Sequence, residues 1–434
     1  MKKNIAFVLL VFSISFTFAQ KKWSLQECVN YALENNISIK KAKLNTINAT
    51  EDVTIAKANL LPNVSADASQ NFGVNSKYKR INPNTNFGVS ANVDLYNGGR
   101  NKLNITQAEN RIFLSKLDLE TLQSNISLQI ANNYLNALLN KENIKVAKEQ
   151  MNITKIQLNK MQELIDAGVN PRADLLDIQA TLAQNKEQLV KAENALDLAL
   201  LNLAQLIQVS PNGFDIKEVN IPLNQAVLLY EDTTPIYETA VKSRPEIHRA
   251  EIEIENADLA IKSAKTYLLP SVGLNYRLNT SYAYRYSGDG ALNKIFDQYN
   301  DNHGHNIGIS ARYTIFDGKA NKARIEKAKI TRAIVEENLE DQKLKLRETI
   351  ERAFLDTKSS LKQYESSLSS LKAQEEAFKI AEERYKLGAI NSFDFDIVKS
   401  RLFNAKIAMI NAKYNFIFKT KVLDFYNNKP IVIE

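Results

Sequence analysis

Few side chains in this sequence are arranged for catalysis or metal binding. The only cysteine is Cys28, and all three histidines lie beyond the middle of the chain. Two of them, His303 and His305, fall in the Asn-rich segment 301–305, which we interpret as a solvated loop because one short histidine pair supplies too few ligands for a structural metal site. The sequence shows no Ser/His/Asp constellation, no phosphate-binding loop and no carboxylate pair in a plausible pocket. We therefore expect no enzyme activity, no metal and no cofactor.

A more regular pattern surrounds two glycines that are 220 residues apart. Three carboxylates and one tyrosine lie close to these glycines: Asp174 and Asp177 after Gly168, and Tyr385 and Asp394 on either side of Gly388. A carboxylate at the start of a helix can cap the first N–H groups or stabilise the positive end of the helix dipole. Helix capping is therefore one interpretation of Asp174 and Asp394.

The two glycines belong to a tandem repeat. Residues 56–64 (AKANLLPNV) recur at 264–272 (AKTYLLPSV), an offset of 208, and residues 88–102 resemble residues 308–322, an offset of 220. The second copy therefore carries twelve extra residues between the two blocks, which we place within 282–305 at an expected hairpin tip. A duplication of this size predicts two structurally similar halves.

Each half contains two segments in which polar and apolar residues alternate, and these predict strands over about 62–76, 86–97, 270–286 and 306–317. Each alternating run has about ten residues, the length that a tilted strand needs to cross a bilayer. We assign Val89 and Ile309 to a lipid-facing side. The charged residues assigned to the opposite, lumen-facing side are Asp67, Asp94, Arg277 and Arg312. A soluble sandwich with one solvated face is the alternative.

Long helices are expected in the remaining sequence. Residues 100–167 and 319–387 contain neither Gly nor Pro, and at 1.5 Å per residue each run would form a rod of roughly 100 Å. Heptad-spaced apolar residues after the two glycines predict return helices over about 171–209 and 392–426, so that each rod forms an antiparallel coiled-coil hairpin. Shorter helices are expected over 24–61 and about 235–269, with a small belt at 209–234. Four strands cannot close a barrel, so several chains must contribute.

The first nineteen residues have the pattern of a signal peptide. Lys2 and Lys3 precede an apolar run, and small residues at positions 17 and 19 suit cleavage before Gln20. An N-terminal anchor helix is the alternative, although the run of about 14 residues is shorter than the roughly 20 that span a bilayer. The formal charge of +7 comes from 56 basic and 49 acidic residues. These charges interleave on helix surfaces and form no focused stripe, so we expect no nucleic-acid partner.

Taken together, these features resemble the TolC-like outer-membrane efflux proteins. The resemblance rests on the duplicated Leu-Leu-Pro strand starts, the strand-to-helix junctions at 96–99 and 316–318, and the sequence Tyr-Lys-Leu-Gly at 385–388 followed by Asp394. It implies an α+β fold in which coiled-coil hairpins form a periplasmic tunnel and four strands per chain join a trimeric 12-stranded transmembrane β-barrel. The implied segments are a signal peptide (1–19), a first repeat (20–208), an equatorial connection (209–234), a second repeat (235–426) and a tail (427–434).

The resemblance also implies a function. Such proteins are passive exit ducts in the outer membrane with a long periplasmic extension, and they serve tripartite efflux or type I secretion systems. The implied partners are two further copies of the chain in a homotrimer, outer-membrane lipid, a periplasmic adaptor protein and an inner-membrane transporter. The sequence does not select among drugs, metal ions and polypeptides as cargo. A structural coiled-coil protein of the envelope, without transport activity, is the alternative.

The resemblance assigns roles to the residues around the two glycines. The residues implied to form a periplasmic constriction are Asp174, Asp177, Asp394 and Tyr385, with Gly168 and Gly388 at the hairpin turns. The carboxylates would form an acidic ring, and Tyr385 could hydrogen-bond Asp174 across neighbouring hairpins. This chain departs from the family pattern at Ile390, where a basic residue is common, and at Ile397, where a second ring carboxylate is expected. We therefore expect a weaker latch and a less charged ring.

Overall fold

The computed structural model describes residues 22–75, 80–169, 171–219, 227–283, 294–429 and 431. The expected signal peptide at 1–19 lies outside the described residues, as does 284–293 of the expected hairpin tip. The chain divides into two compact units. We call Met1–Lys40, Thr121–Arg244 and Leu344–Glu434 the hairpin unit, and Lys41–Glu120 with Pro245–Lys343 the sheet unit.

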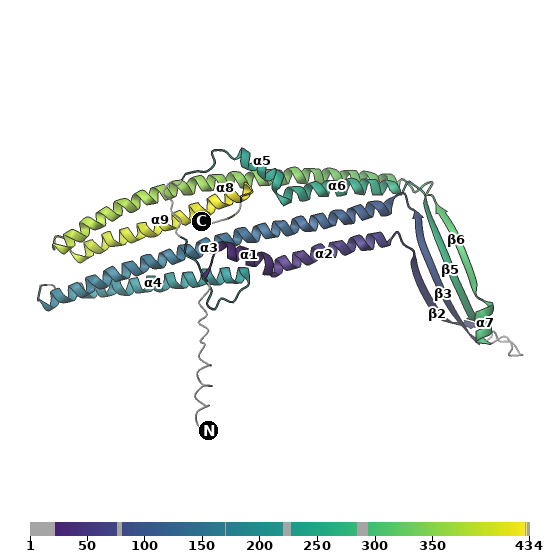
Figure 1. Ribbon diagram of the computed structural model, residues 1–434, viewed down its shortest axis with the longest axis horizontal. Coiled ribbons are helices and arrows are strands. Elements are labelled where there is room, and N and C mark those ends of the chain that lie inside the picture. The colour runs from purple at the N-terminus through teal and green to yellow at the C-terminus, as the bar shows by residue number, and fades with distance from the viewer. Residues whose placement is uncertain are drawn as a thin grey trace, which may run out of the picture. The chain divides into compact units, whose positions relative to one another are not determined.

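The sheet unit contains one antiparallel sheet of four strands in the order β2-β3-β5-β6 (Figure 1). The strands are β2 (Asn63–Asn75), β3 (Arg80–Tyr96), β5 (Ser271–Ala283) and β6 (Gly304–Arg312). Residues that lie directly opposite one another in an antiparallel sheet share a face. Ala66 is opposite Val89, which is opposite Leu278, so the apolar positions of successive strands line up on one face and the polar positions on the other.

Two strand ends differ from the sequence prediction. Strand β3 begins at Arg80 rather than near residue 86, because β2 remains paired with it as far as Asn75. Strand β6 ends at Arg312 rather than near residue 317. Arg312 pairs with Ser271, the first residue of β5, and the preceding Pro270 has no N–H group with which to extend the ladder.

The helices of the sheet unit enter and leave the sheet at one end. They are most of α2 (Ile37–Ala58), α6 (Pro245–Thr266) and the adjoining parts of α3 (Arg100–Asp166) and α8 (Ala320–Lys386). The short helix α7 (Ile295–Asp301) lies at the opposite end of the strands (Figure 1). The junctions before α3 and α8 repeat the same hydrogen bond, because Asn97 Oδ1 accepts from Asn101 N and Asp317 Oδ2 accepts from Asn321 N. Gly98 has φ +70°, and a Cβ there would lie 3.0 Å from the Thr266 carbonyl oxygen, so this junction requires glycine.

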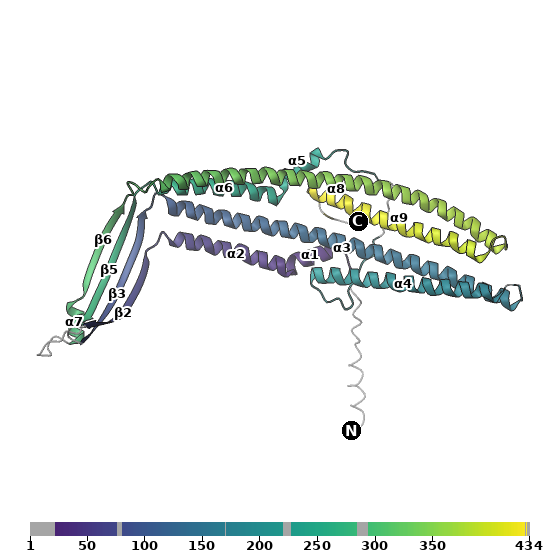
Figure 2. The same ribbon diagram turned by 180° about the vertical axis from the view of Figure 1, so that it is seen from behind.

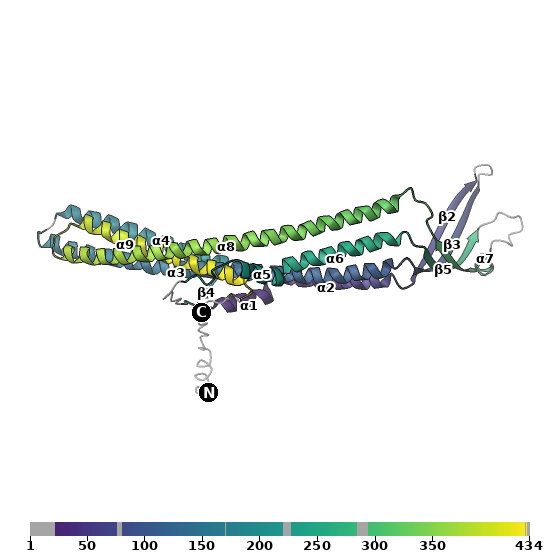
Figure 3. The ribbon, with the colours of Figure 1, turned by 90° about the horizontal axis from the view of Figure 1, so that it is seen from above.

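The hairpin unit contains two helical hairpins. Helix α4 (Arg172–Ile207) returns along α3, and α9 (Ser392–Tyr426) returns along α8, as Figures 1 and 2 show. Figure 3 shows α8 and α9 side by side from another direction. The heptad positions face the partner helices. Buried residues at these positions include Leu175, Leu182, Leu203, Phe395, Leu402, Phe416 and Leu423.

Two helices that the sequence predicts as continuous are interrupted. The expected helix over 24–61 consists of α1 (Leu25–Asn35) and α2, with Asn36 between them, and the one over 235–269 consists of α5 (Thr234–Ser243) and α6, with Arg244 between them. Arg244 is extended (φ −80°, ψ 126°) because it precedes Pro245, which disfavours the helical conformation in the residue before it. Asn36 is also non-helical, and its side-chain oxygen accepts from Ser38 N at 2.8 Å.

The expected belt at 209–234 is anchored by a short parallel pair. Strand β1 (Lys22–Trp23) pairs with β4 (Asp215–Ile216). Lys141 Nζ lies 2.6 Å from Asp215 Oδ1 and donates to the Ile216 carbonyl at 2.9 Å. The buried Tyr134 hydroxyl lies within hydrogen-bond distance of the Trp23 and Lys217 carbonyls, and burial raises its pKa. No helix within the described residues is long and apolar enough to span a membrane.

Candidate functional site

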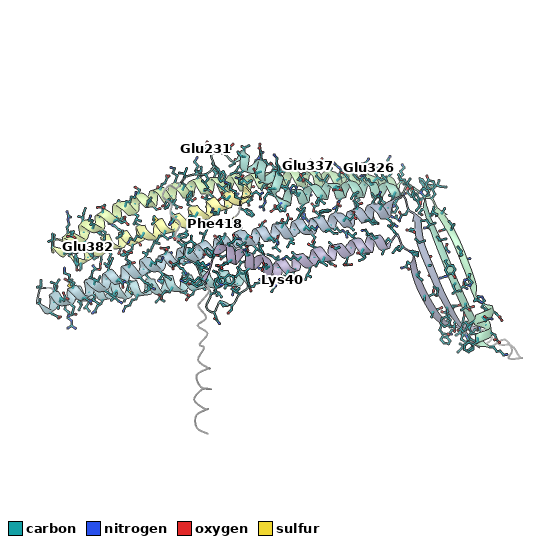
Figure 4. The ribbon with its side chains drawn as sticks, viewed as in Figure 1. Lys40, Glu231, Glu326, Glu337, Glu382 and Phe418 are labelled. Carbon is teal, nitrogen blue, oxygen red and sulfur yellow. The ribbon has the colours of Figure 1, made fainter. Side chains whose placement is uncertain are left out.

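The two hairpin turns have the same backbone geometry. Gly168 has φ +74°, and Val169 N donates to the Leu164 carbonyl at 2.8 Å; Gly388 has φ +71°, and Ala389 N donates to the Arg384 carbonyl at 2.8 Å. This is the left-handed termination that glycine allows at the end of a helix. The turns therefore bring the starts of α4 and α9 directly back beside the ends of α3 and α8. In Figure 4, Glu382 marks the part of α8 that leads into the second turn.

The carboxylates after the turns do not occupy the cap positions. The N-cap of α4 is Pro171, and the N-cap of α9 is Asn391, whose side-chain oxygen accepts from Asp394 N at 2.8 Å. Asp174 and Asp394 are each the third residue of their helices. The interpretation of these two residues as N-caps is therefore wrong. A carboxylate in the first turn still interacts favourably with the helix dipole, and the exposed Asp177 and Asp394 side chains face solvent in the single chain.

Tyr385 lies at the C-terminal end of α8 and packs against the N-terminal end of α9. Its ring stacks on Phe395, with ring centroids 4.7 Å apart and an interplanar angle of 10°. Burial raises the pKa of Tyr385, and the negative charges of Asp396 and Asp174 raise it further. The hydroxyl is therefore neutral and protonated at physiological pH, and it lies within electrostatic reach of Asp174 on the other hairpin of the same chain.

A buried lysine links the two hairpins close to Tyr385. The Lys399 side chain is 1% exposed, and its Nζ lies 2.5 Å from Asp396 Oδ1, 2.5 Å from Gln157 Oε1 and 3.0 Å from Thr154 Oγ1. Asn185 Nδ2 donates to Thr154 Oγ1 at 2.8 Å. We call these five residues the Lys399 cluster. It joins α9 of the second hairpin to both helices of the first.

Sequence reasoning missed the Lys399 cluster. The corresponding positions in the first repeat, 220 residues earlier, are Gln179 and Leu176, so the repeat gave no sign of a charge pair. One signal was present. Lys399 follows Phe395 by four residues and precedes Leu402 by three, which places it on the same helix face as two buried apolar residues. Desolvation lowers the pKa of Lys399, and the nearby Asp396 opposes that shift.

A second, more exposed link runs between the same two helices. Lys406 Nζ on α9 lies 2.8 Å from Glu149 Oε1 and 2.9 Å from Oε2 on α3. The two side chains are 21% and 48% exposed. Because solvent screens such a pair, it contributes much less to stability than a buried one.

The strand register places the charged residues assigned to the barrel lumen on one face. Asp67 pairs with Gly88, and Asp94 pairs with Gly273; Arg277 pairs with Ser90, and Arg312 pairs with Ser271. By the alternation of each strand, all four charged residues belong to the polar face. Gly88 leaves room for the Asp67 side chain, since a Cβ at Gly88 would lie 2.9 Å from Asp67 Oδ1. Val89 and Ile309 belong to the opposite, apolar face.

The three histidines have different surroundings. His248 Nδ1 lies 3.1 Å from Glu251 Oε2 on the surface of α6. His305 belongs to strand β6, and its Nδ1 lies 2.8 Å from the Tyr276 hydroxyl, so the interpretation of this residue as part of a solvated loop is wrong. Its strand assignment was missed because the Asn-rich segment 301–305 suggested a loop. The residues that the structure describes contain no group of three or more His, Cys, Asp or Glu side chains that could hold a metal ion.

Comparisons with known proteins cover both repeats. The model of the family described as outer membrane efflux protein matches residues 28–208 and 236–418. Outer membrane protein TolC of Vibrio cholerae is 22% identical over 411 residues, which cover 92% of this chain and 90% of that protein. TolC of Escherichia coli is 22% identical over 422 residues, which cover 96% of this chain and 84% of that protein. The crystal structure of the Vibrio cholerae outer membrane protein VceC has a TM-score of 0.73 at 16% identity, covering 94% of this chain and 97% of that one.

These matches confirm three expectations from the sequence: the family resemblance, the combination of a helical tunnel with a β-barrel, and the location in the outer membrane. The agreement of the solved structure extends over nearly the whole chain, so it concerns the sheet as well as the hairpins. The chain belongs to the outer membrane efflux protein family.

Proposed function

We propose that three copies of this chain form a passive exit duct that a periplasmic adaptor connects to an inner-membrane transporter. The observation that carries this proposal is the incomplete sheet. Its edge strands β2 and β6 have no further partner strand among the described residues. Unpaired edges at membrane depth would leave backbone groups without hydrogen bonds, so the sheet must close with other copies. Three copies supply twelve strands.

The two faces of the sheet fit this arrangement. In the closed barrel the apolar face, with Val89 and Ile309, contacts lipid, and the polar face lines the lumen. The lumen charges assigned from the sequence are Asp67, Asp94, Arg277 and Arg312. Two acidic and two basic residues per chain balance one another. We therefore propose that these four residues give the barrel lumen little preference for the sign of a solute's charge.

The hairpin turns form the proposed constriction. Asp174, Asp177 and Asp394 follow Gly168 and Gly388 closely, and three carboxylates from each of three chains give nine around one axis. A ring of this kind concentrates cations by its focused field. Ile397 is 37% exposed at the position where a further carboxylate was expected, which supports a less charged ring. We propose that the neutral hydroxyl of Tyr385 assists closure through Asp174, whose charge contributes to the raised pKa of Tyr385.

Apolar side chains near the turns support docking of an adaptor. Leu387 is 82% exposed and Phe393 is 72% exposed. A photo-crosslinking residue at position 387 should capture the adaptor in whole cells, whereas one at Glu337, in the sheet unit (Figure 4), should not. Equal capture at both positions would contradict docking at the turns.

Loss of the gene product tests the transport function. Deletion should raise the accumulation of dyes and antibacterial compounds, and re-expression of the unchanged chain should restore efflux. The protein should fractionate with outer membranes and require detergent for extraction. A structural coiled-coil protein of the envelope predicts the opposite: release by osmotic shock and unchanged accumulation. Screening a compound panel in the deletion strain would also identify the cargo class.

A further inference from the structure

Helix α7 packs on the apolar face of the sheet. The Tyr299 ring lies 5.4 Å from the Phe87 ring on β3 and 6.2 Å from the Tyr282 ring on β5. The Tyr299 carbonyl accepts a hydrogen bond from Thr280 Oγ1 at 2.6 Å. In the strand register Phe87 is opposite Thr280, and both alternate with the polar positions. The helix therefore lies on the same side of the sheet as Val89 and Ile309.

An apolar stripe on α7 extends beyond the sheet. Tyr299 follows Ile295 by four residues and Phe296 by three, so Ile295 and Phe296 flank Tyr299 on one side of the helix. Tyr299 contacts the sheet, whereas Phe296 is 86% exposed and Ile295 is 47% exposed. The exposed Asp297 lies on the opposite side of the helix, and the exposed Asn300, one turn beyond Phe296, lies at the margin of the stripe. The stripe thus extends the apolar face of the sheet, and the described residues of the chain leave Phe296 and Ile295 exposed.

The position of α7 indicates what covers this stripe. Its contacts are with β3 and β5, the two middle strands, whereas a neighbouring copy would pair with the edge strands β2 and β6. A neighbouring copy is therefore poorly placed to bury Phe296. Helix α7 also lies at the end of the strands far from the junctions with α2, α3, α6 and α8 (Figure 1). With the helices in the periplasm, this end of the barrel is at the outer leaflet.

We propose that α7 is an interfacial lipid anchor, with Phe296 and Ile295 inserted among acyl chains just below the headgroups of the outer leaflet. A short amphipathic helix of this kind lies in the membrane plane with its apolar side buried, and aromatic side chains favour this depth. The inference rests on the proposed outward orientation of the apolar face. It assigns a lipid-binding role to the segment that is longer in the second repeat than in the first.

Tryptophan fluorescence tests the anchor in the full-length trimer. Trp23 is the only tryptophan, so a Trp23→Phe background gives a protein without tryptophan. Phe296→Trp is added to this background, and the protein is reconstituted into phosphatidylcholine vesicles with or without bromine atoms near the top of the acyl chains. We expect loss of emission in the brominated vesicles and a blue shift relative to detergent-free unfolded protein. If Trp23→Phe impairs assembly, Trp23 is kept and the emission of the parent protein is subtracted.

Two further positions separate the anchor from the orientation of the barrel. Asn306→Trp lies on the polar face of β6 and should not be quenched, whereas Ile309→Trp on the apolar face should be quenched by bromine placed deeper in the chains. Quenching at 306 instead of 309 would overturn the face assignment. Quenching at 309 without quenching at 296 would overturn the anchor alone and would indicate that water or a second copy covers Phe296.

Discussion

The buried charge of Lys399 distinguishes the contact between the two hairpins from an ordinary coiled coil. Lys399 has three oxygen partners and almost no exposure to solvent. A buried charge is tolerated only when it is paired and hydrogen-bonded, and here α3 supplies two of the partners. The sequence alone could not predict this cluster, because a lysine in a charged helix is usually exposed and because the pairing depends on which helix lies beside α9.

The Lys399 cluster should stabilise the hairpin unit. Replacing Lys399 with Met leaves the partly buried Asp396 carboxylate, which is 23% exposed, without its cation, and we expect a cost of about 3 kcal/mol. Lys406→Met is the matched control, because it removes an exposed ion pair on the same helix and should cost no more than about 1 kcal/mol. Thermal unfolding followed by circular dichroism in detergent measures both. Similar melting temperatures for the two variants would show that the cluster contributes no more than a surface pair.

Glu27 gives a prediction about acid stability. Hydrogen bonds from Ser24, followed by the Lys217 cation, lower the pKa of Glu27 from 4.5 to about 2. A carboxylate with a lowered pKa stabilises the folded state above its unfolded pKa, and this stabilisation is lost as pH falls through the folded value. The melting temperature of the protein should therefore fall between pH 4.5 and about 2. The melting temperature of the Glu27→Gln variant should fall less steeply over this pH range. If the melting temperatures of the unchanged protein and of Glu27→Gln depended on pH in the same way, Glu27 would not be a source of the acid sensitivity.

At the scale of elements, the strands and rods were more predictable than their interruptions. Polar residues such as Ser65 and Asp67 in β2, and apolar residues such as Val89 in β3, alternate with residues of the opposite kind. This alternation predicts a sheet with one polar face, because successive side chains of a strand point to opposite faces. The break at Arg244 could have been found from Pro245. Helix α7 could not, because its seven residues are too few for periodicity to distinguish a helix from a loop and because α7 is held by contacts with β3 and β5.

The face assignment of the strands predicts an asymmetric tolerance to charge. Ile309→Arg should destabilise insertion by about 2 to 4 kcal/mol, because it places a cation in the lipid near the bilayer midplane. Ser310→Arg, on the next residue of the same strand, should be mild because its side chain enters the lumen. Folding yields in lipid vesicles, titrated with urea, compare the two variants. Equal destabilisation would rule out the proposed faces.

For the whole molecule, the two sheet edges that lack a partner strand among the described residues require further copies of the chain, and the proposed number of copies is three. Four strands per chain close a barrel of practical size only when several chains combine, and three chains place twelve strands around one axis. The protein purified in detergent should therefore have three times the mass of the mature chain by native mass spectrometry. A stable monomer or dimer that still conducts ions in planar bilayers would contradict the proposed barrel.

We propose that three copies form a duct whose narrow end is lined by Asp174, Asp177 and Asp394, and single-channel recording in planar bilayers measures the effect of these residues on ion flow. The trimer should form channels that trivalent cations block from the periplasmic side. Asp174→Ala combined with Asp394→Ala should raise the conductance and abolish the block, Tyr385→Phe should loosen closure without removing the block, and the control Glu193→Ala on the exposed part of α4 should change neither. Unchanged conductance and unchanged block in the double variant would show that Asp174 and Asp394 do not line the narrow end, and would leave the closure of the duct to apolar residues such as Ile390 and Ile397.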